Sequence, residues 1–221
     1  MTNRWETLAR KDAEFYIWTD LAKGDDFFAS GERDVERILA YAAPFIRDTH
    51  VALEIGCGVG RLTIPMSRHF ERIVAVDIAP TMLQKLAANC QAREIAHVTP
   101  MLAGDAWQNV APVDFAYSRI VLQHIEEWAT IVDYFRRIST CLANDGAFYV
   151  QFDTRPANVV YHVKNHLPDV VLPRNFRRGV RRIRRTMHDI ASLADASGLQ
   201  LNASRGAGTE DTEFVFTKRS N

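Results

Sequence analysis

The sequence has few of the features that mark secreted or membrane-spanning chains. Its 221 residues include only three cysteines, Cys57, Cys90 and Cys141, which are far apart and form no Cys-x-x-Cys pair. This pattern argues against a disulfide framework or a zinc cluster and suits a reducing cytosol. No apolar run approaches the ~20 residues of a membrane span, and the charged start MTNRWETLARKD has no apolar signal core. We therefore expect a cytoplasmic protein without a bound metal or a membrane partner.

The chain also has no net charge, because 27 Lys and Arg residues balance 27 Asp and Glu residues. With 47% hydrophobic and 24% charged residues, its composition is that of an ordinary globular protein with no overall attraction to nucleic acid. The charge is nevertheless unevenly distributed. Residues 154–187 contain nine basic residues and one acid, so this segment is +8 and the remainder, with 18 basic and 26 acidic residues, is −8.

Hydrophobic periodicity predicts two helices at 5–20 and 32–43, followed by strands that alternate with helical patterns. The predicted strands are 51–55, 73–76, 98–102, 114–117 and 147–152, and the helical patterns between them are 60–69, 80–92 and 127–142. Such alternation indicates βαβ units and a parallel sheet with helices on both faces.

The end of the chain completes this organisation. A helix at 188–197 precedes two strands at 199–204 and 213–217, which we expect as an antiparallel pair at the sheet edge. The predicted fold is an α/β, doubly wound, Rossmann-like sheet of seven strands in one domain over 1–221. We expect residues 1–49 to form a helical cover and residues 154–187 a basic insertion over the substrate.

Three glycines follow the first predicted strand. The strand VALEI runs into Gly56, Gly58 and Gly60, just before a helical pattern. Glycines at such a junction let the backbone turn tightly and approach a ligand whose polar end meets the helix N-terminus. Their spacing is G-x-G-x-G, whereas the dinucleotide-binding fingerprint is G-x-G-x-x-G.

Polar residues stand at the ends of the neighbouring strands. Glu54 precedes the first glycine by two residues, and Asp77 ends the second strand, where a carboxylate can accept both hydroxyls of a ribose. Asp105 follows the third strand, and the fourth runs through Ser118 toward His124. These strand ends face one crevice, which is where open α/β sheets bind ligands.

In this series of motifs, residues 30–153 resemble the class I S-adenosylmethionine-dependent methyltransferases, particularly small-molecule enzymes related to quinone biosynthesis. The resemblance implies S-adenosylmethionine as the cofactor, with its methionine part over Gly56, Cys57 and Gly58 and its ammonium near Glu54. The other cofactor contacts that it implies are Asp77 at the ribose, Ile78 and Met82 at the adenine faces, Asp105, Ala106 and Trp107 at the adenine edge, and Ser118 at the sulfonium. Gly60 completes the loop, and Gly31 belongs to an N-terminal segment, DDFFASGERD, that is expected to fold over the cofactor or to cap a helix.

Methyl transfer is an in-line displacement at a sulfonium, so alignment and exclusion of water matter most. A base is needed only when the acceptor is a hydroxyl or a protonated amine. The candidates are His124, Asp153, His162 and Tyr161, of which we favour His124, because similar enzymes often carry His there and imidazole titrates in a useful range. The alternative role of His124 is that of a hydrogen-bonded structural histidine.

The basic insertion contains RNFRRGVRRIRR at 174–185. The spacing predicts a helix with six arginines on one face: Arg174, Arg177, Arg178, Arg181, Arg182 and Arg185. These could pair with acids of the remaining chain, bind a phosphate or carboxylate of the acceptor together with Tyr161, or contact RNA. For the substrate we single out Tyr161, Arg177 and Arg181.

The expected function is therefore methyl transfer to oxygen or nitrogen of a small acceptor, for which anionic and glycan-like metabolites are the leading classes. The alternatives are an RNA methyltransferase that uses the arginine segment and a non-catalytic protein that keeps the cofactor fold. An NAD(P)-dependent oxidoreductase would have G-x-G-x-x-G and a catalytic Tyr-x-x-x-Lys pair, and neither is present.

Overall fold

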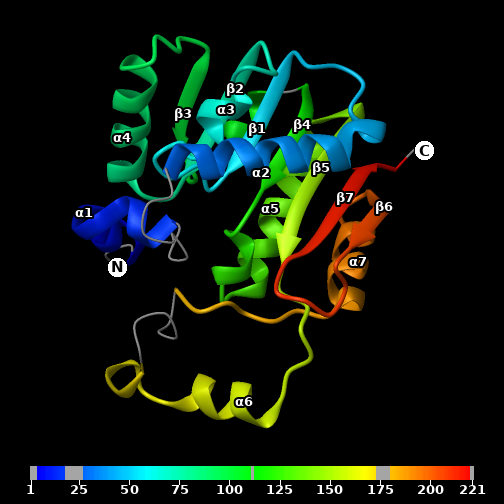
Figure 1. Cartoon of the computed structure of the whole chain (residues 1–221). Helices are drawn as coiled ribbons and strands as arrows, with labels where there is room; N and C mark the ends of the chain where they lie inside the picture. Colours follow the sequence, from blue (N-terminus) through cyan, green and yellow to red (C-terminus); the bar gives the residue numbers. More distant parts are fainter. Residues whose placement is uncertain (1–3, 18–26, 111, 173–179, 220–221) are drawn as a thin grey trace.

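The computed structural model describes residues 4–17, 27–110, 112–172 and 180–219, and its centre is a seven-stranded sheet (Figure 1). The strand order is β3-β2-β1-β4-β5-β7-β6, in which β1 to β5 are parallel and β7 is antiparallel to both of its neighbours. The strands are β1 Val51–Ile55, β2 Arg72–Asp77, β3 Val98–Leu102, β4 Val113–Ser118, β5 Leu142–Phe152, β6 Leu199–Arg205 and β7 Thr212–Lys218. This arrangement confirms the predicted Rossmann-like fold and its antiparallel edge pair.

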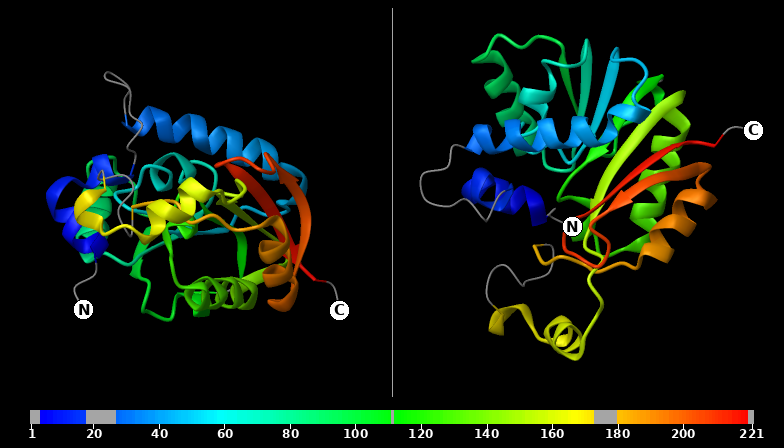
Figure 2. Two further views of the ribbon diagram at one scale, coloured as in Figure 1. Left: turned by 90° about the horizontal axis from the view of Figure 1, so that it is seen from below. Right: turned by 45° about the vertical axis from the view of Figure 1, so that its right-hand side comes forward.

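Helices cover both faces of the sheet, with α2 on one side and α5 and α7 on the other (Figure 2). The helices are α1 Arg4–Ile17, α2 Phe27–Ala42, α3 Thr63–Met66, α4 Pro80–Gln91, α5 Trp128–Cys141, α6 Val159–His166 and α7 Met187–Ala196. Short 3-10 turns add η1 Ala43–Phe45, η2 Trp107–Val110, η3 Leu122–His124 and η4 Asp169–Val171.

The two faces of the sheet carry separate cores, because successive residues of a strand point to opposite sides. On one face, Leu53 and Phe148 pack in a cluster that includes residues of α5 and α7. On the other face, Ala52, Phe115 and Tyr149 pack in a cluster that includes residues of α2 and α4. The inner strands β1, β2, β4, β5 and β7 therefore consist mostly of buried residues, whereas the edge strands β3 and β6 are mostly exposed or half-buried.

Helix α2 begins earlier than the sequence predicts, at Phe27 rather than near residue 32, and this places Gly31 inside the helix. A Cβ atom on Gly31 would lie 1.9 Å from the main-chain oxygen of Arg61. The missing side chain thus lets α2 approach the turn that follows β1. Helix α3 is shorter than the predicted 60–69, because the chain turns at Gly60 with φ +98° before the helix begins.

The predicted helix at 174–185 is wrong over the half that the structure describes. Residues 180–186 contain no helical residue, and Arg184 forms a parallel bridge with Asp153 at the end of β5. The main-chain N–H groups of Ile183 and Arg185 donate to the carbonyl oxygens of Gln123 (2.6 Å) and Asp153 (3.0 Å). These tertiary hydrogen bonds replace the hydrogen bonds of a helix, so the arginine spacing alone did not predict the conformation of this segment. We call residues 180–186 the strap; Arg174, Arg177 and Arg178 lie outside the described residues.

Two glycine substitutions test the contact between α2 and the turn. Gly31→Ala should lower the free energy of unfolding by about 1–3 kcal/mol, since its Cβ collides with main-chain atoms that cannot rotate away. Gly104→Ala is the matched control, because a Cβ there meets no atom within 4 Å. Urea denaturation measures both variants. Equal stability of the two would contradict the close packing at Gly31.

Candidate active site

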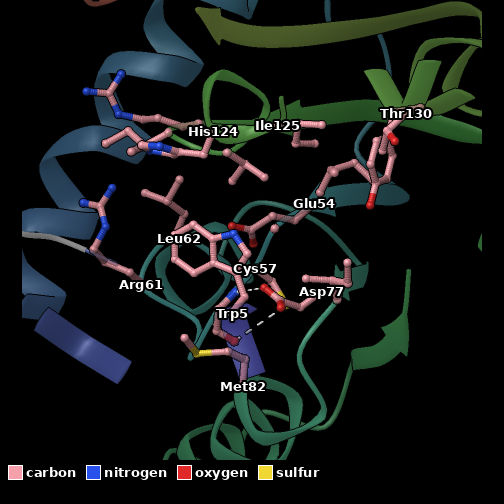
Figure 3. A pocket seen from close by; sticks show the side chains of 18 of the residues that line it. Trp5, Glu54, Cys57, Arg61, Leu62, Asp77, Met82, His124, Ile125 and Thr130 are labelled. Atoms are coloured by element: carbon pink, nitrogen blue, oxygen red, sulfur yellow. Dashed lines mark hydrogen bonds between the residues drawn. The ribbon is translucent and has the colours of Figure 1, made fainter. Parts of the chain in front are cut away.

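A cavity of about 370 Å³ opens at the carboxyl ends of β1, β2 and β4, and side chains from several elements point into it (Figure 3). Its lining includes eight of the residues that the sequence predicts: Glu54, Gly56, Cys57, Gly58, Asp77, Ile78, Met82 and His124. Trp5 of α1 also lines the cavity, so the N-terminal segment contributes to this site.

The carboxylate of Asp77 closes the glycine loop against β2. Its Oδ2 accepts the N–H of Gly58 at 2.9 Å, and its Oδ1 accepts the N–H of Ala79 at 2.8 Å. The loop can take this path because Gly56 and Gly58 adopt φ values of +79° and +54°, which disfavour side chains. Burial raises the pKa of Asp77, while its two main-chain hydrogen bonds oppose that rise. Each carboxylate oxygen keeps a second lone pair for a ligand hydroxyl.

Glu54 is a nearly buried carboxyl group on the floor of the cavity. Thr63 Oγ1 and Tyr117 OH both donate to its Oε2, at 2.6 and 2.8 Å. Within the part of the chain that the structure describes, Oε1 accepts no hydrogen bond. Burial raises the pKa of Glu54 to about 7, although the two hydroxyl donors lower it. A cationic group in the cavity would therefore stabilise the ionised form of Glu54.

His124 lies across the cavity from Glu54 and is oriented by the strap. Its Nδ1 is 3.1 Å from the main-chain oxygen of Arg181, so Nδ1 donates and Nε2 is the accepting nitrogen. The amide nitrogen Nε2 of Gln123 lies 3.5 Å from His124 Nε2. The Trp5 ring lies 6.0 Å from the imidazole, edge to face. Burial lowers the pKa of His124 to about 4, which keeps the ring neutral at pH 7. The residue is thus placed as a neutral acceptor rather than as a cation.

Sequence reasoning missed two arginines of the cavity wall, Arg61 and Arg119, both nearly buried. Arg61 Nη1 and Arg119 Nε lie 2.8 and 3.2 Å from Asp34 Oδ2, so one carboxylate of α2 joins them. Arg119 also pairs with Glu213 of β7 at 3.4 Å. Arg61 directly follows the glycine loop and Arg119 follows Ser118, so their positions beside the motifs were an available signal.

A buried glutamine that the sequence did not single out holds the loop after β4. Ile120 has φ +57°, a conformation that β-branched residues rarely adopt, and its side chain lines the cavity. Gln151 Oε1 accepts the N–H of Ile120 at 3.0 Å. Gln151 Nε2 donates to Gln123 Oε1 at 3.0 Å and to the main-chain oxygen of Glu210 at 2.7 Å. Gln151 therefore ties this cavity loop to the C-terminal part of the sheet.

Several predicted cofactor residues do not line the cavity, and each has another role. Trp107 is fully buried behind the cavity residue Tyr134, with their rings 6.0 Å apart, and Arg137 covers its face at 3.9 Å. Asp105 accepts the N–H of Leu102 through its side chain at 2.9 Å, and its neighbour Ala106 is exposed. The β3 loop thus supports the wall instead of forming it.

The remaining differences concern small residues and the second candidate base. Ser118 Oγ donates to the carbonyl oxygen of Ile55 at 3.0 Å, and Gly60 packs toward Leu86. Gly31 packs on Arg61 and does not line the cavity. Asp153 is fully buried, and Arg155 Nη2 pairs with its Oδ2 at 2.6 Å. That ion pair occupies the carboxylate, so Asp153 is not placed to act as a base.

The predicted substrate residues also stand outside the cavity lining. Tyr161 OH accepts the N–H of Arg184 at 3.1 Å, and the Arg184 guanidinium lies 4.5 Å from its ring. Arg181 pairs at 3.0 Å with Glu126, which does line the cavity. Arg177 lies outside the described residues. Neither Tyr161 nor Arg181 lines the cavity, and Arg181 is joined to its edge through Glu126.

Comparison with known proteins agrees with this geometry. A family model described as a methyltransferase domain matches residues 27–203, and the chain belongs to that family. With the Rossmann-like sheet and the glycine-loop cavity, it is a class I S-adenosylmethionine-dependent methyltransferase.

Solved structures share its fold at low sequence identity. The CcbJ methyltransferase from Streptomyces caelestis has a TM-score of 0.68 and 15% identity over 99% of this chain and 100% of that chain. Magnesium protoporphyrin IX methyltransferase from Synechocystis PCC 6803, with bound S-adenosylhomocysteine, has a TM-score of 0.64 and 16% identity over 90% of each chain.

A curated relative matches a shorter part of the chain. It is a tRNA/tmRNA (uracil-C(5))-methyltransferase from Campylobacter curvus, 28% identical over 76 residues. The match spans 34% of this chain and about a fifth of the relative's length.

The half-buried, desolvated imidazole of His124 has a consequence for stability. Because the pKa of His124 is about 4 in the folded protein and about 6.5 in an unfolded chain, the unfolded state binds the extra proton between these values. Stability from this group is present above pH 6.5 and is lost as the pH falls toward 4. His124→Gln should remove roughly 1–3 kcal/mol of that pH dependence.

Urea denaturation at pH 7 and pH 4.5 measures this effect, with exposed His69 as the matched control. His69→Gln should keep the pH dependence of the wild type. A His124→Gln protein whose stability falls with acid as steeply as the wild type would contradict the desolvated, neutral imidazole.

Proposed function

We propose that this methyltransferase transfers the methyl group of S-adenosylmethionine to oxygen or nitrogen of a small acceptor. The observation that carries the proposal is the cavity itself. Two carboxylates from adjacent strands, Glu54 and Asp77, flank the glycine loop, and a neutral histidine stands opposite. The magnesium protoporphyrin and mitomycin 7-O-methyltransferase structures, by their names, belong to enzymes with small-molecule acceptors.

The cofactor fits the cavity by its charges. Asp77 would accept hydrogen bonds from the ribose hydroxyls, and the exposed apolar side chain of Ile78 and the buried Met82 would cover the adenine faces. Glu54 Oε1 would accept a hydrogen bond from the methionyl ammonium. The nearby guanidiniums of Arg61 and Arg119 would attract the methionyl carboxylate.

The N-terminal segment forms part of the cofactor cover. Glu6 of α1 accepts both the N–H of Thr81 at 3.0 Å and its hydroxyl at 2.6 Å, which fixes α1 to the start of α4. Trp5 is then held beside the cavity. Such a cover excludes water from the sulfonium, which protects the methyl group until the acceptor is aligned.

His124 acts on the acceptor as an alignment group and weak base. Nδ1 is held by the strap, so Nε2 is the accepting nitrogen of the ring. A hydroxyl or ammonium acceptor would replace the long 3.5 Å contact that Nε2 makes with the Gln123 amide nitrogen. Its low pKa means that the ring is deprotonated over the whole neutral range. A sulfonium needs little further activation, so a weak base suffices.

The basic insertion supplies the charge that an anionic acceptor would meet. Arg181 stands behind Glu126 at the cavity edge, and Arg184 covers the Tyr161 ring. We include Arg177 in this group from the sequence alone. Phosphate, carboxylate or glycan-linked anions are the acceptor classes that guanidiniums recognise best.

RNA is the second acceptor class, favoured by the tRNA/tmRNA methyltransferase match and by the arginines. That match covers a third of this chain, and the structures with small-molecule names cover far more of it. A non-catalytic cofactor-binding protein would use His124 only as the structural histidine that holds the strap.

The affinity for S-adenosylmethionine distinguishes the role of Asp77, at the end of β2, from that of Asp105, which follows β3. Asp77→Ala should weaken S-adenosylmethionine binding by about 2–3 kcal/mol in calorimetry, because two ribose hydroxyls lose their acceptor. Asp105→Ala is the matched control from the neighbouring strand end, and it should change affinity by less than about 3-fold. NADH should show no saturable binding. Tight NADH binding without S-adenosylmethionine binding would overturn the proposal.

Transfer of labelled methyl groups into a cell extract tests the acceptor class. We expect label in small metabolites, and His124→Gln should slow the transfer by about 100-fold while cofactor affinity stays within about 3-fold. Label found only in RNA would replace the small acceptor by RNA. Cofactor binding with no transfer to any fraction would favour the non-catalytic alternative.

A further inference from the structure

Helix α5 presents two hydroxyl groups to the cavity. Thr130 and Tyr134 are one helical turn apart, so they lie on the same side of α5, and both line the cavity. Within the described ranges, neither hydroxyl has a hydrogen-bond partner in the protein. The neighbouring side of the helix, with Ile131 and Phe135, is packed in the core. Neither α5 nor any other helix of the described residues is long and apolar enough to cross a membrane. The helix therefore has an apolar side toward the core and a polar side toward the cavity.

The two hydroxyls lie where the adenine of the proposed cofactor would end. Figure 3 shows Thr130 and Arg61 on opposite sides of the cavity. Burial raises the pKa of Tyr134, and the charge of Asp77 adds to this rise, so the Tyr134 hydroxyl lies near the carboxylate that would receive the ribose. A cofactor with its methionyl carboxylate at Arg61 and its ribose at Asp77 would extend its adenine toward α5.

The Tyr134 ring is held by packing on the loop after β3. It lies 6.0 Å from the Trp107 ring at an interplanar angle of 18°, and Trp107 is itself fully buried. Trp107 Nε1 donates to the main-chain oxygen of Ala103 at 3.2 Å, and the Arg137 guanidinium lies 3.9 Å from the Trp107 ring. A hydroxyl on a ring fixed in this way costs little conformational entropy when it bonds to a ligand.

The loop after β3 has its own polar groups engaged within the protein. Asp105 Oδ2 accepts the N–H of Leu102 at 2.9 Å. Arg137 donates to the main-chain oxygens of Ala103, at 3.0 Å, and of Asp105. None of residues 105–107 lines the cavity, although the sequence predicts them at the adenine edge. The hydroxyls of α5 are therefore better placed for that edge than this loop is.

We propose that Thr130 and Tyr134 recognise the adenine edge of S-adenosylmethionine from α5, in place of the loop after β3. Adenine presents an amino group that donates and ring nitrogens that accept, and a hydroxyl can do either. Two adjacent hydroxyls can thus pair with the amino group and with a neighbouring ring nitrogen. A purine without the amino group leaves one of them unpaired, so the pair selects adenine. The proposal rests on the proposed function, because it needs the same cofactor in the same cavity.

Calorimetry with S-adenosylhomocysteine and with its analogue that lacks the 6-amino group of the purine tests this recognition. The wild type should bind S-adenosylhomocysteine at least about 5-fold more tightly than the analogue. The double variant Thr130→Val, Tyr134→Phe keeps the shapes of both side chains and removes both hydroxyls. It should bind S-adenosylhomocysteine about 10-fold more weakly than the wild type and lose most of the preference for the amino group.

The variant Thr140→Val, Tyr41→Phe is the matched control. Thr140 is an exposed residue of α5 whose hydroxyl donates to the main-chain oxygen of Arg136 at 2.9 Å, and Tyr41 belongs to α2. Neither Thr140 nor Tyr41 lines the cavity. The control should bind both ligands as the wild type does, and so it separates the loss of hydroxyls at the cavity from the loss of hydroxyls elsewhere.

The recognition from α5 is wrong if the wild type binds both ligands equally, if the double variant keeps wild-type affinity, or if it loses the same factor for both ligands. The last result would mean that the hydroxyls do not meet the amino group. In each of these cases S-adenosylhomocysteine still binds the wild type, so the proposed cofactor stands. Failure of the wild type to bind either ligand would instead contradict the proposed function, and with it the recognition from α5.

Discussion

The cavity depends on one buried carboxylate. Asp34 of α2 holds Arg61, which follows the glycine loop, and Arg119, which follows β4. A buried guanidinium without a partner is strongly destabilising. The segment after the glycine loop and the segment after β4 must therefore take positions in which Asp34 reaches both arginines. The approach of α2 that brings Asp34 into place requires the bare backbone of Gly31. Helix packing and cavity shape are thus parts of one arrangement.

Local patterns were sufficient for the parts of the site that a single segment defines. Glu54, Gly56, Gly58 and Asp77 could be predicted because each stands at a strand end, and a parallel sheet gathers those ends at one edge. The strands themselves were predictable from short apolar runs. Arg61 and Arg119 stand beside these motifs, but their pairing could not be predicted, because it needs the carboxylate of Asp34 from a helix far away in the sequence.

Other expectations failed because tertiary contacts outweighed local spacing. The arginines at 180–186 follow a helical repeat, yet their main chain pairs with Gln123 and Asp153. Trp107 follows a strand end as a ligand wall would, but Tyr134 stands between it and the cavity, and Arg137 holds it from the other side. Neither competing contact leaves a trace in the nearby sequence. Ile120 is similar, because its positive φ depends on the distant Gln151.

The raised pKa of Glu54 couples cofactor binding to the release of protons. Near pH 7 this carboxyl group is divided between its neutral and ionised forms. In the proposed complex the methionyl ammonium selects the ionised form, so each binding event releases a fraction of a proton to the solvent. The heat of binding then depends on the ionisation enthalpy of the buffer, and affinity increases as the pH rises through 7. The demethylated product, S-adenosylhomocysteine, keeps the same ammonium group as S-adenosylmethionine. The affinities of both therefore change with pH in the same way, and their ratio does not depend on pH.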